Sequence, residues 1–289
     1  MKKHILVTIS DNISCLHGVR FVGSFFRGNP ALRITLVFVE QTRPDSVAGS
    51  MGSMWEGGDG SVAPAASPKA LKALNAATRL LVSEMDFKVE QINSKVMPGK
   101  RGIPADIIHE GQSGLYDAVV LGKRALGVFE SLFTERITDT LLLKEIVFPF
   151  WTCRNPVLSR KNVLLCADGS DAAARIADHV GFMLHDQQEH RITILSIDNK
   201  TGRNPDDIID STAKVLKQNG IDDHQIESRV IRSKNILNTI RETAAAEAYA
   251  VVAVGREGHR KTGFEKWLAG STCRDLVQEM TGSVLWISR

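Results

Sequence analysis

The sequence contains few cysteines, and no spacing connects them. Its four cysteines, Cys15, Cys153, Cys166 and Cys273, lie far apart along 289 residues and form no CxxC pair. Dispersed cysteines predict neither a disulfide framework nor a zinc site, and reduced thiols are typical of cytoplasmic proteins. The eight histidines show no HxxxH or HExxH spacing, so the sequence does not support a metal site either.

Long apolar runs and a strong charge of one sign are also missing. No window approaches 18 apolar residues, and the two N-terminal lysines precede only five residues of apolar character. Neither a membrane span nor a secretory signal is therefore expected. The net charge of +3 is small for a nucleic-acid-binding protein. Because 43% of the residues are hydrophobic and 24% are charged, we expect a cytoplasmic globular protein with a substantial core.

The chain contains an internal repeat. KHILVTISDNISCLHGVRFVG, from Lys3, aligns with KNVLLCADGSDAAARIADHVG, from Lys161, at an offset of 158. YDAVVLGKR (116–124) aligns with YAVVAVGRE (249–257) at an offset of 133, and Trp151 aligns with Trp286. The sequence therefore predicts two tandem domains, 1–153 and 160–289, joined by the short linker RNPVLSR.

The change of offset places 25 additional residues in the first half. The segment 41–67 is rich in Gly, Ser and Pro and has neither a helical nor a strand period. Such a segment buries too little apolar area to offset its ordering entropy, so we expect a mobile insertion. Met51, Met54 and Trp55 leave a lid or docking role open.

Strand and helix patterns alternate within each half. In the second half, short apolar runs predict strands at 162–167, 191–197, 225–231, 249–255 and 283–288. Helical spacing predicts helices at 170–185, 205–220, 236–248 and 271–280, with Ser170 or Asp171 as the first cap. This alternation predicts an α/β fold in which each domain is an open five-stranded parallel sheet with helices on both faces.

The candidate site lies at the carboxyl ends of the strands, where open parallel sheets bind ligands. Asp168 ends one strand, Gly255 and Gly258 follow another, and Gly270, Ser271 and Thr272 open a helix. Glycines and a helix start offer backbone N–H groups to phosphates. Positive charge can come from Arg256, His259, Arg260 and Lys261. Hydroxyl donors can come from Ser271 and Thr272. A purely structural interpretation remains open, in which Gly255 ends a strand, Ser271 caps a helix and the basic residues are solvated.

NVLLCADGSDAAARIADHV and VAVGREG followed by GST resemble the universal stress protein family, and the repeat suggests a tandem member. The resemblance implies an acid at Asp168, phosphate contacts at Gly255, Gly258 and Gly270-Ser271, and an adenine contact near Ile197. Eleven residues separate Gly258 from Gly270, where nucleotide-binding members have nine. The implied cofactor is ATP or AMP, with Mg²⁺ as an optional companion.

The first half departs from this pattern. Ser10 stands opposite Asp168, with Asp11 one place later, and Glu135-Arg136 stand opposite Gly270-Ser271. A carboxylate there would repel phosphate, so we expect the first site to be degenerate and empty. The last strands of the two halves, VFPFW and SVLWI, are expected to be edges that meet within one chain as a pseudo-dimer. A homodimer remains an alternative.

The leading hypothesis is a stress-response protein that binds an adenine nucleotide and acts through a protein partner rather than as an enzyme. No catalytic set can be assigned, and His179 and His185 are expected on a helix surface. One alternative is an interaction scaffold that binds no nucleotide. Another is an enzyme like the ATP pyrophosphatases, because ADGSDA faintly resembles their SGGxDS loop, although Asp168 replaces a glycine and Ala172 replaces the serine.

Overall fold

The computed structural model describes residues 1–41, 66–122, 125–127, 146–199, 203–256 and 271–289. Gly258, His259, Arg260, Lys261, Gly270 and Glu135-Arg136 lie outside the described residues, as does nearly all of the insertion expected at 41–67. The described strands form one ten-stranded sheet in the order β3-β2-β1-β4-β5-β10-β9-β6-β7-β8. The predicted α/β fold class is confirmed.

Each half contributes five strands to this sheet. The first half supplies β1 (Lys3–Ile9), β2 (Leu32–Gln41), β3 (Ile92–Gly99), β4 (Ala118–Leu121) and β5 (Phe150–Thr152). The second half supplies β6 (Val163–Ala167), β7 (Ile192–Asp198), β8 (Ile226–Arg232), β9 (Val251–Gly255) and β10 (Val284–Ser288). Within each half the described strands pair only in parallel. The five strand patterns predicted for the second half are all present.

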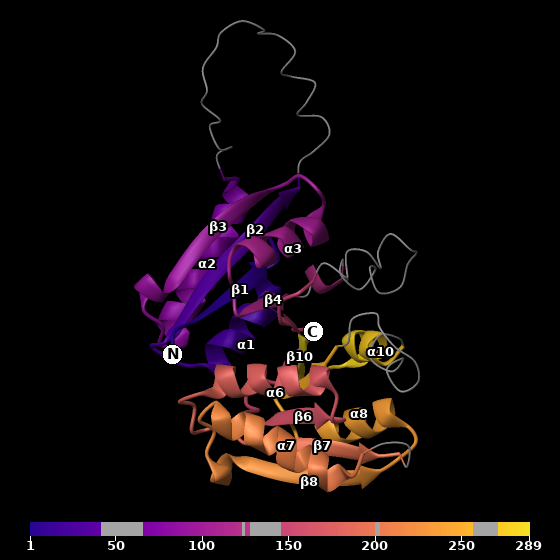
Figure 1. Cartoon of the computed structure of the whole chain (residues 1–289). Coiled ribbons are helices and arrows are strands. Elements are labelled where there is room, and N and C mark those ends of the chain that lie inside the picture. Colours follow the sequence, from indigo (N-terminus) through magenta and orange to yellow (C-terminus); the bar gives the residue numbers. More distant parts are fainter. Residues whose placement is uncertain (42–65, 123–124, 128–145, 200–202, 257–270) are drawn as a thin grey trace, which may run out of the picture.

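Helices cover both faces of the sheet (Figure 1). The first half has α1 (His17–Phe25), α2 (Pro68–Glu84) and α3 (Ile103–Ser113), with single-turn helices η1 (Ile13–Cys15) and η3 (Val89–Gln91). The second half has α6 (Asp171–Leu184), α7 (Pro205–Gln218), η4 (Asp223–Gln225), α8 (Ile236–Ala246) and α10 (Ser271–Glu279). The four helices expected in the second half are therefore confirmed.

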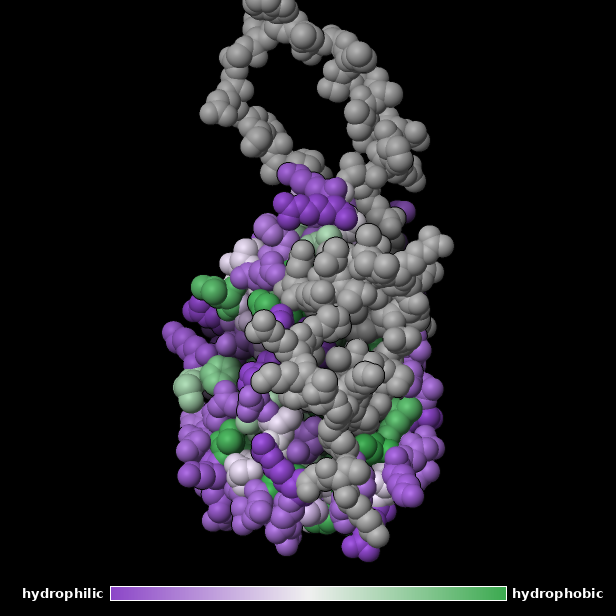
Figure 2. Space-filling model, turned by 45° about the vertical axis from the view of Figure 1, so that its right-hand side comes forward, coloured by the Kyte–Doolittle hydropathy of each residue, from purple (hydrophilic) through white to green (hydrophobic). Residues whose placement is uncertain are grey.

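Two apolar cores lie on opposite faces of the sheet. Alternate strand residues point to opposite faces, so Ile5 and Val7 join the core under α1, α2, α6 and α7. Leu6 joins the other core, under α3, α8 and α10. The part of the described surface visible in Figure 2 is mainly hydrophilic, with hydrophobic residues scattered over it. Among the described residues, no helix is both long enough and apolar enough to cross a membrane.

The two halves meet through their last strands, as the sequence predicts. β5 and β10 pair antiparallel, with Trp151 opposite Trp286. The two indole rings stack with centroids 4.1 Å apart and planes inclined by 7°, and both side chains are fully buried. Each strand thereby covers the exposed edge of the other.

His179 corrects one expectation, because it lies at this junction and not on a helix surface. Only 7% of the residue is exposed, and its Nε2 accepts a hydrogen bond of 3.1 Å from Trp151 Nε1. Burial lowers the pKa of His179 to about 3, so the ring is neutral and can accept this bond. The helical period placed His179 on the outside of the second half, but that side of α6 faces the first half.

Candidate functional site

A pocket opens at the carboxyl ends of β6, β7 and β9. The strand order reverses between β9 and β6, and this reversal leaves a crevice between helices on the two faces. About 440 Å³ of space that is open to solvent lies in and above this pocket. It is lined by Cys166, Ala167, Asp168, Ala173, Leu195, Ile197, Ile236, Ile240, Val254 and Gly255.

Asp168 carries the only carboxylate among these lining residues, and a tight turn after β6 positions it. Gly169 has a φ of +77°, a conformation that glycine adopts without strain. Asp168 Oδ1 accepts a hydrogen bond of 2.9 Å from the Ser170 backbone N–H. Ser170 Oγ then accepts from Ala173 N at 3.1 Å and caps α6, which confirms Ser170 as the cap. The turn thus fixes Asp168 and the first turn of α6 at the pocket.

The pocket is otherwise mainly apolar. Leu195 and Val254 come from the sheet, and Ile236 and Ile240 come from the first turns of α8. Burial raises the pKa of the Cys166 thiol to about 12, and the nearby charge of Asp168 contributes to the increase. The thiol is therefore protonated at neutral pH and is a poor nucleophile.

The structure brings together three of the residues predicted for the site. Asp168, Ile197 and Gly255 all line the pocket. Ser271 begins α10 and Thr272 lies in its first turn, so the predicted helix start is confirmed. Gly258 and Gly270 lie outside the described residues, and their proposed phosphate contacts remain predictions.

Arg256 has a different position from the one its sequence context suggests. Its Nη2 donates to the Ile146 carbonyl at 2.7 Å, and its guanidinium lies 6.0 Å from the centroid of the Phe150 ring. Both partners belong to the first half, and Arg256 is not among the lining residues. Its side chain therefore connects the end of β9 to the neighbouring half.

Close packing explains why position 255 is glycine. A Cβ added there would lie 2.3 Å from the Ala172 carbonyl oxygen and 2.8 Å from Ala173 N. The first turn of α6 thus approaches β9 more closely than any side chain at 255 allows. This requirement is independent of phosphate binding and agrees with the structural interpretation of Gly255.

Sequence reasoning missed several residues near the pocket. Cys166, Ile236 and Ile240 line it, and the strand-end and helix-start positions of these residues were the available signal. Arg203, before α7, donates from its guanidinium to the carbonyl of Gly169. No local pattern indicates that contact, because Arg203 and Gly169 come from different loops.

The equivalent crevice in the first half is smaller and differently bonded. Its open space is about 260 Å³ and it is lined by Thr8, Ser10 and His17, among others. Thr8 Oγ1 donates to the Val120 carbonyl at 3.0 Å and accepts from Gly122 N at 3.0 Å. This hydroxyl links β1 to the end of β4. Cys166 occupies the corresponding position in the second half, 158 residues later.

Within the parts of the chain that the structure describes, no group of three His, Cys, Asp or Glu residues could hold a metal ion.

Comparisons with known proteins place the second half in a family. The model of the universal stress protein family matches residues 159–288. A universal stress protein from Archaeoglobus fulgidus DSM 4304 has a similar structure, with a TM-score of 0.62 at 16% identity, covering 99% of this chain and 96% of its own. A structure assigned to the same family, from Pseudomonas aeruginosa UCBPP-PA14, has a TM-score of 0.50 at 14% identity, covering 99% and 93%.

A further universal stress protein, solved in complex with cAMP, covers 45% of this chain and 97% of its own at 19% identity, with a TM-score of 0.37. No curated protein matches the sequence. The likenesses to the Archaeoglobus fulgidus and Pseudomonas aeruginosa structures show a shared fold, and the family model identifies the domain. The second half, residues 159–288, is thus a universal stress protein domain.

Proposed function

We propose that the second half binds an adenine nucleotide, ATP or AMP, and that the chain acts as a regulatory binding protein in a cytoplasmic stress response. The observation that carries this proposal is the pocket at the strand reversal, which combines an apolar interior with a single carboxylate. On this proposal residues 1–153 and 160–289 are two domains, and only the second holds ligand.

The chemistry of the lining residues suggests how a nucleotide would lie. A purine ring is flat and largely apolar, so it suits the space between Leu195, Ile197 and Ile240. The carboxylate of Asp168 can accept hydrogen bonds from ribose hydroxyls, but it repels phosphates. The phosphates would therefore extend away from Asp168, toward the helix start at Ser271.

Binding, rather than catalysis, is the role that these residues support. The Cys166 thiol is protonated, and no base lies among the lining residues beside a nucleophile. We propose that nucleotide occupancy is read by a protein partner.

Calorimetric titration of the full chain with ATP and with AMP, with and without Mg²⁺, tests the proposal. One nucleotide per chain is expected. Replacing Asp168 with alanine should weaken affinity at least about tenfold, because a hydrogen bond to a charged group contributes about 1.5–3 kcal/mol. The matched control is Ser10→Ala, at the corresponding position of the first half, which should leave affinity unchanged.

An interaction scaffold without nucleotide is the second candidate. Two observations favour it, because packing alone explains Gly255 and because Arg256 contacts the first half. Absence of heat at millimolar nucleotide would reject nucleotide binding and favour the scaffold. Pyrophosphate release from ATP with candidate acceptors would instead support the pyrophosphatase-like enzyme.

A further inference from the structure

One peptide unit in the turn between β6 and α6 is bonded at both of its polar atoms. The peptide that joins Gly169 to Ser170 donates its N–H to Asp168 Oδ1 at 2.9 Å. The carbonyl oxygen of the same peptide accepts a hydrogen bond from the Arg203 guanidinium. A rigid, planar unit therefore connects Arg203 to the only carboxylate among the residues that line the pocket.

The orientation of this peptide decides where the Asp168 carboxylate is held. Gly169 has a φ of +77° and lacks a Cβ, so its backbone can adopt conformations that other residues cannot. Rotation of the peptide would take the Ser170 N–H away from Asp168 and the carbonyl away from Arg203 at the same time. The bond from Arg203 therefore favours the orientation in which the N–H faces the carboxylate.

Arg203 reaches the turn from the start of α7, which is itself fixed. Asn204 Oδ1 accepts a hydrogen bond of 3.2 Å from Asp206 N and caps this helix. The aliphatic part of the arginine also packs on the turn, since a Cβ added to Gly169 would lie 3.2 Å from Arg203 Cδ and 3.1 Å from Ile208 Cγ1. Residues at the start of α7 thus cover this side of the turn.

The charge of Arg203 acts on the carboxylate through the peptide. A guanidinium that donates to a carbonyl oxygen polarises the amide, and the N–H of that amide becomes a stronger donor. The Ser170 N–H therefore binds Asp168 Oδ1 more tightly than it would without the arginine. Because a carboxylate has two oxygens, this bond can fix the group while Oδ2 accepts from a ligand.

The first half has neither member of this pair. Ser10 aligns with Asp168. Ala66 stands two residues before α2, as Arg203 stands two residues before α7, and an alanine side chain cannot donate a hydrogen bond. The carboxylate and the guanidinium therefore occur together, in the half that has the larger pocket.

We propose that Arg203 is a positioning residue for ligand binding: its bond to the Gly169 carbonyl holds the Asp168 carboxylate where it accepts hydrogen bonds from the ribose hydroxyls of a nucleotide. Arg203 acts through Asp168 and not by contact with the phosphates, which extend toward Ser271. The identity of the ligand rests on the proposed function, whereas the effect of Arg203 on the turn can be measured without a ligand.

Exchange of the Ser170 backbone amide, measured by NMR on the ligand-free full chain, tests the effect on the turn. Arg203→Met keeps much of the side-chain length but removes the donor. The Ser170 amide should then exchange about two- to tenfold faster than in wild type, as the loss of one hydrogen bond implies. Arg203→Lys retains a charged donor and should exchange at close to the wild-type rate.

Calorimetric titration with AMP tests the effect on the ligand. Arg203→Met should weaken AMP affinity about two- to tenfold. The same substitution should have no effect in the Asp168→Ala background, because the carboxylate that it positions is absent. Adenosine, which has the ribose but no phosphate, should lose the same factor as AMP.

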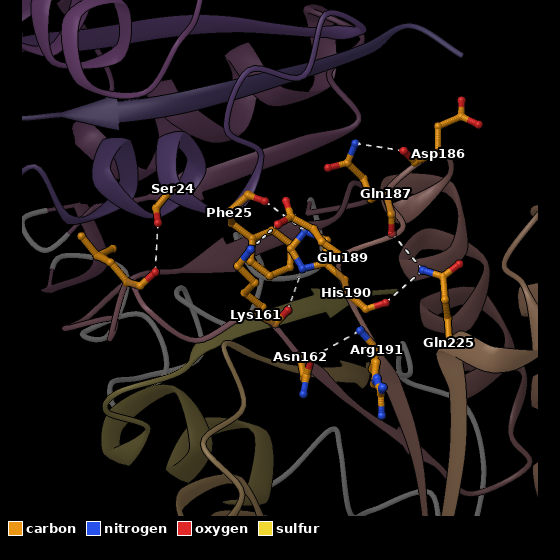
Figure 3. Close-up of polar contacts among 11 residues, drawn as sticks. Ser24, Phe25, Lys161, Asn162, Asp186, Gln187, Glu189, His190, Arg191 and Gln225 are labelled. Atoms are coloured by element: carbon orange, nitrogen blue, oxygen red, sulfur yellow. Dashed lines mark hydrogen bonds and ion pairs between the residues drawn. The ribbon is translucent and has the colours of Figure 1, made fainter.

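The matched control is Arg191→Met, because Arg191 is an exposed arginine at the opposite end of β7. Its backbone N–H donates to Asn162 Oδ1 at 3.3 Å (Figure 3), and its guanidinium pairs with Glu227. This control should leave both Ser170 exchange and AMP affinity unchanged.

Two results would overturn the proposal: unchanged Ser170 exchange in Arg203→Met, or a loss of AMP affinity in Arg203→Met that persists without the Asp168 carboxylate. Faster Ser170 exchange in Arg203→Met, combined with a wild type that binds no AMP, would support the role of Arg203 in the turn and reject the proposed function.

Discussion

The two halves have the same framework but different crevices. Each half arranges its strands so that its first strand lies between the second and the fourth, and each has a glycine after or at the end of the fourth strand, Gly122 or Gly255. In the first half Thr8 bonds across the crevice, whereas Cys166 leaves the second crevice open as the larger pocket. The residue at this aligned position, Thr8 or Cys166, is therefore one of the differences between the two crevices.

The amino ends of the strands show much less divergence. Tyr116 donates to Glu110 at 2.8 Å, and the aligned Tyr249 donates to Glu247 at 2.7 Å, while the Thr193 hydroxyl lies 2.8 Å from the Tyr249 oxygen and can donate to it. Burial raises the pKa of Tyr116 to about 12, with Glu110 contributing, so the hydroxyl remains a donor. Both halves thus keep a tyrosine–carboxylate hydrogen bond at the amino end of the fourth strand, whereas the carboxyl ends differ at Thr8 and Cys166.

The largest expected effect concerns the two glycines. Gly255→Ala should cost about 3 kcal/mol of unfolding free energy, because its Cβ would lie 2.3 Å from the Ala172 carbonyl oxygen. The matched Gly122→Ala should cost only about 1 kcal/mol, because the nearest atom, the Thr8 carbonyl oxygen, is 3.0 Å away. Urea unfolding of both variants measures the difference. If both variants lost the same unfolding free energy, the packing of α6 would not require a glycine at position 255.

An intermediate effect is expected from exchanging the crevice residues. Cys166→Thr should reproduce the bonds of Thr8, from β6 to the end of β9, and so close the pocket. We expect about 1 kcal/mol of added stability and about tenfold weaker AMP binding.

Thr8→Ala is the control for this exchange. It should lower stability by about 1 kcal/mol and leave AMP affinity unchanged, as measured by thermal unfolding and calorimetry. If the Cys166→Thr protein is stabilised but still binds AMP with wild-type affinity, the residue at this aligned position, Thr8 or Cys166, does not decide which crevice is open.

The smallest effect is expected from the insertion that only the first half carries. The Ser67 backbone N–H donates to Glu40 Oε1 at 2.7 Å, so the two ends of the insertion are already close. Replacing residues 42–65 by a short Gly-Ser linker should change stability by less than about 1 kcal/mol, since loop length contributes only logarithmically. A large drop in the midpoint of thermal unfolding would indicate that Met51, Met54 or Trp55 packs on the fold.

Local patterns in the sequence determined much of this protein. Apolar runs and helical spacing identified the five strands and four α-helices described in the second half, although not the single-turn helix η4, and the alternation of the two indicated the parallel sheet. The Ser170 cap and the helix start at Ser271 were also predictable, because caps depend on residues within one turn. The repeat placed Trp151 against Trp286, since aligned edge strands tend to cover each other.

Only the tertiary structure decided the contacts between segments that are distant in the chain. Its neighbours in the sequence predict Arg256 as a phosphate contact, and only the structure shows that its guanidinium donates to the Ile146 carbonyl in the other half. His179 had the spacing of an exposed helical residue, but its side of α6 packs against Trp151. Periodicity shows which face of an element is apolar. It cannot show which distant side chain covers the polar face, because that depends on how the two halves fit together.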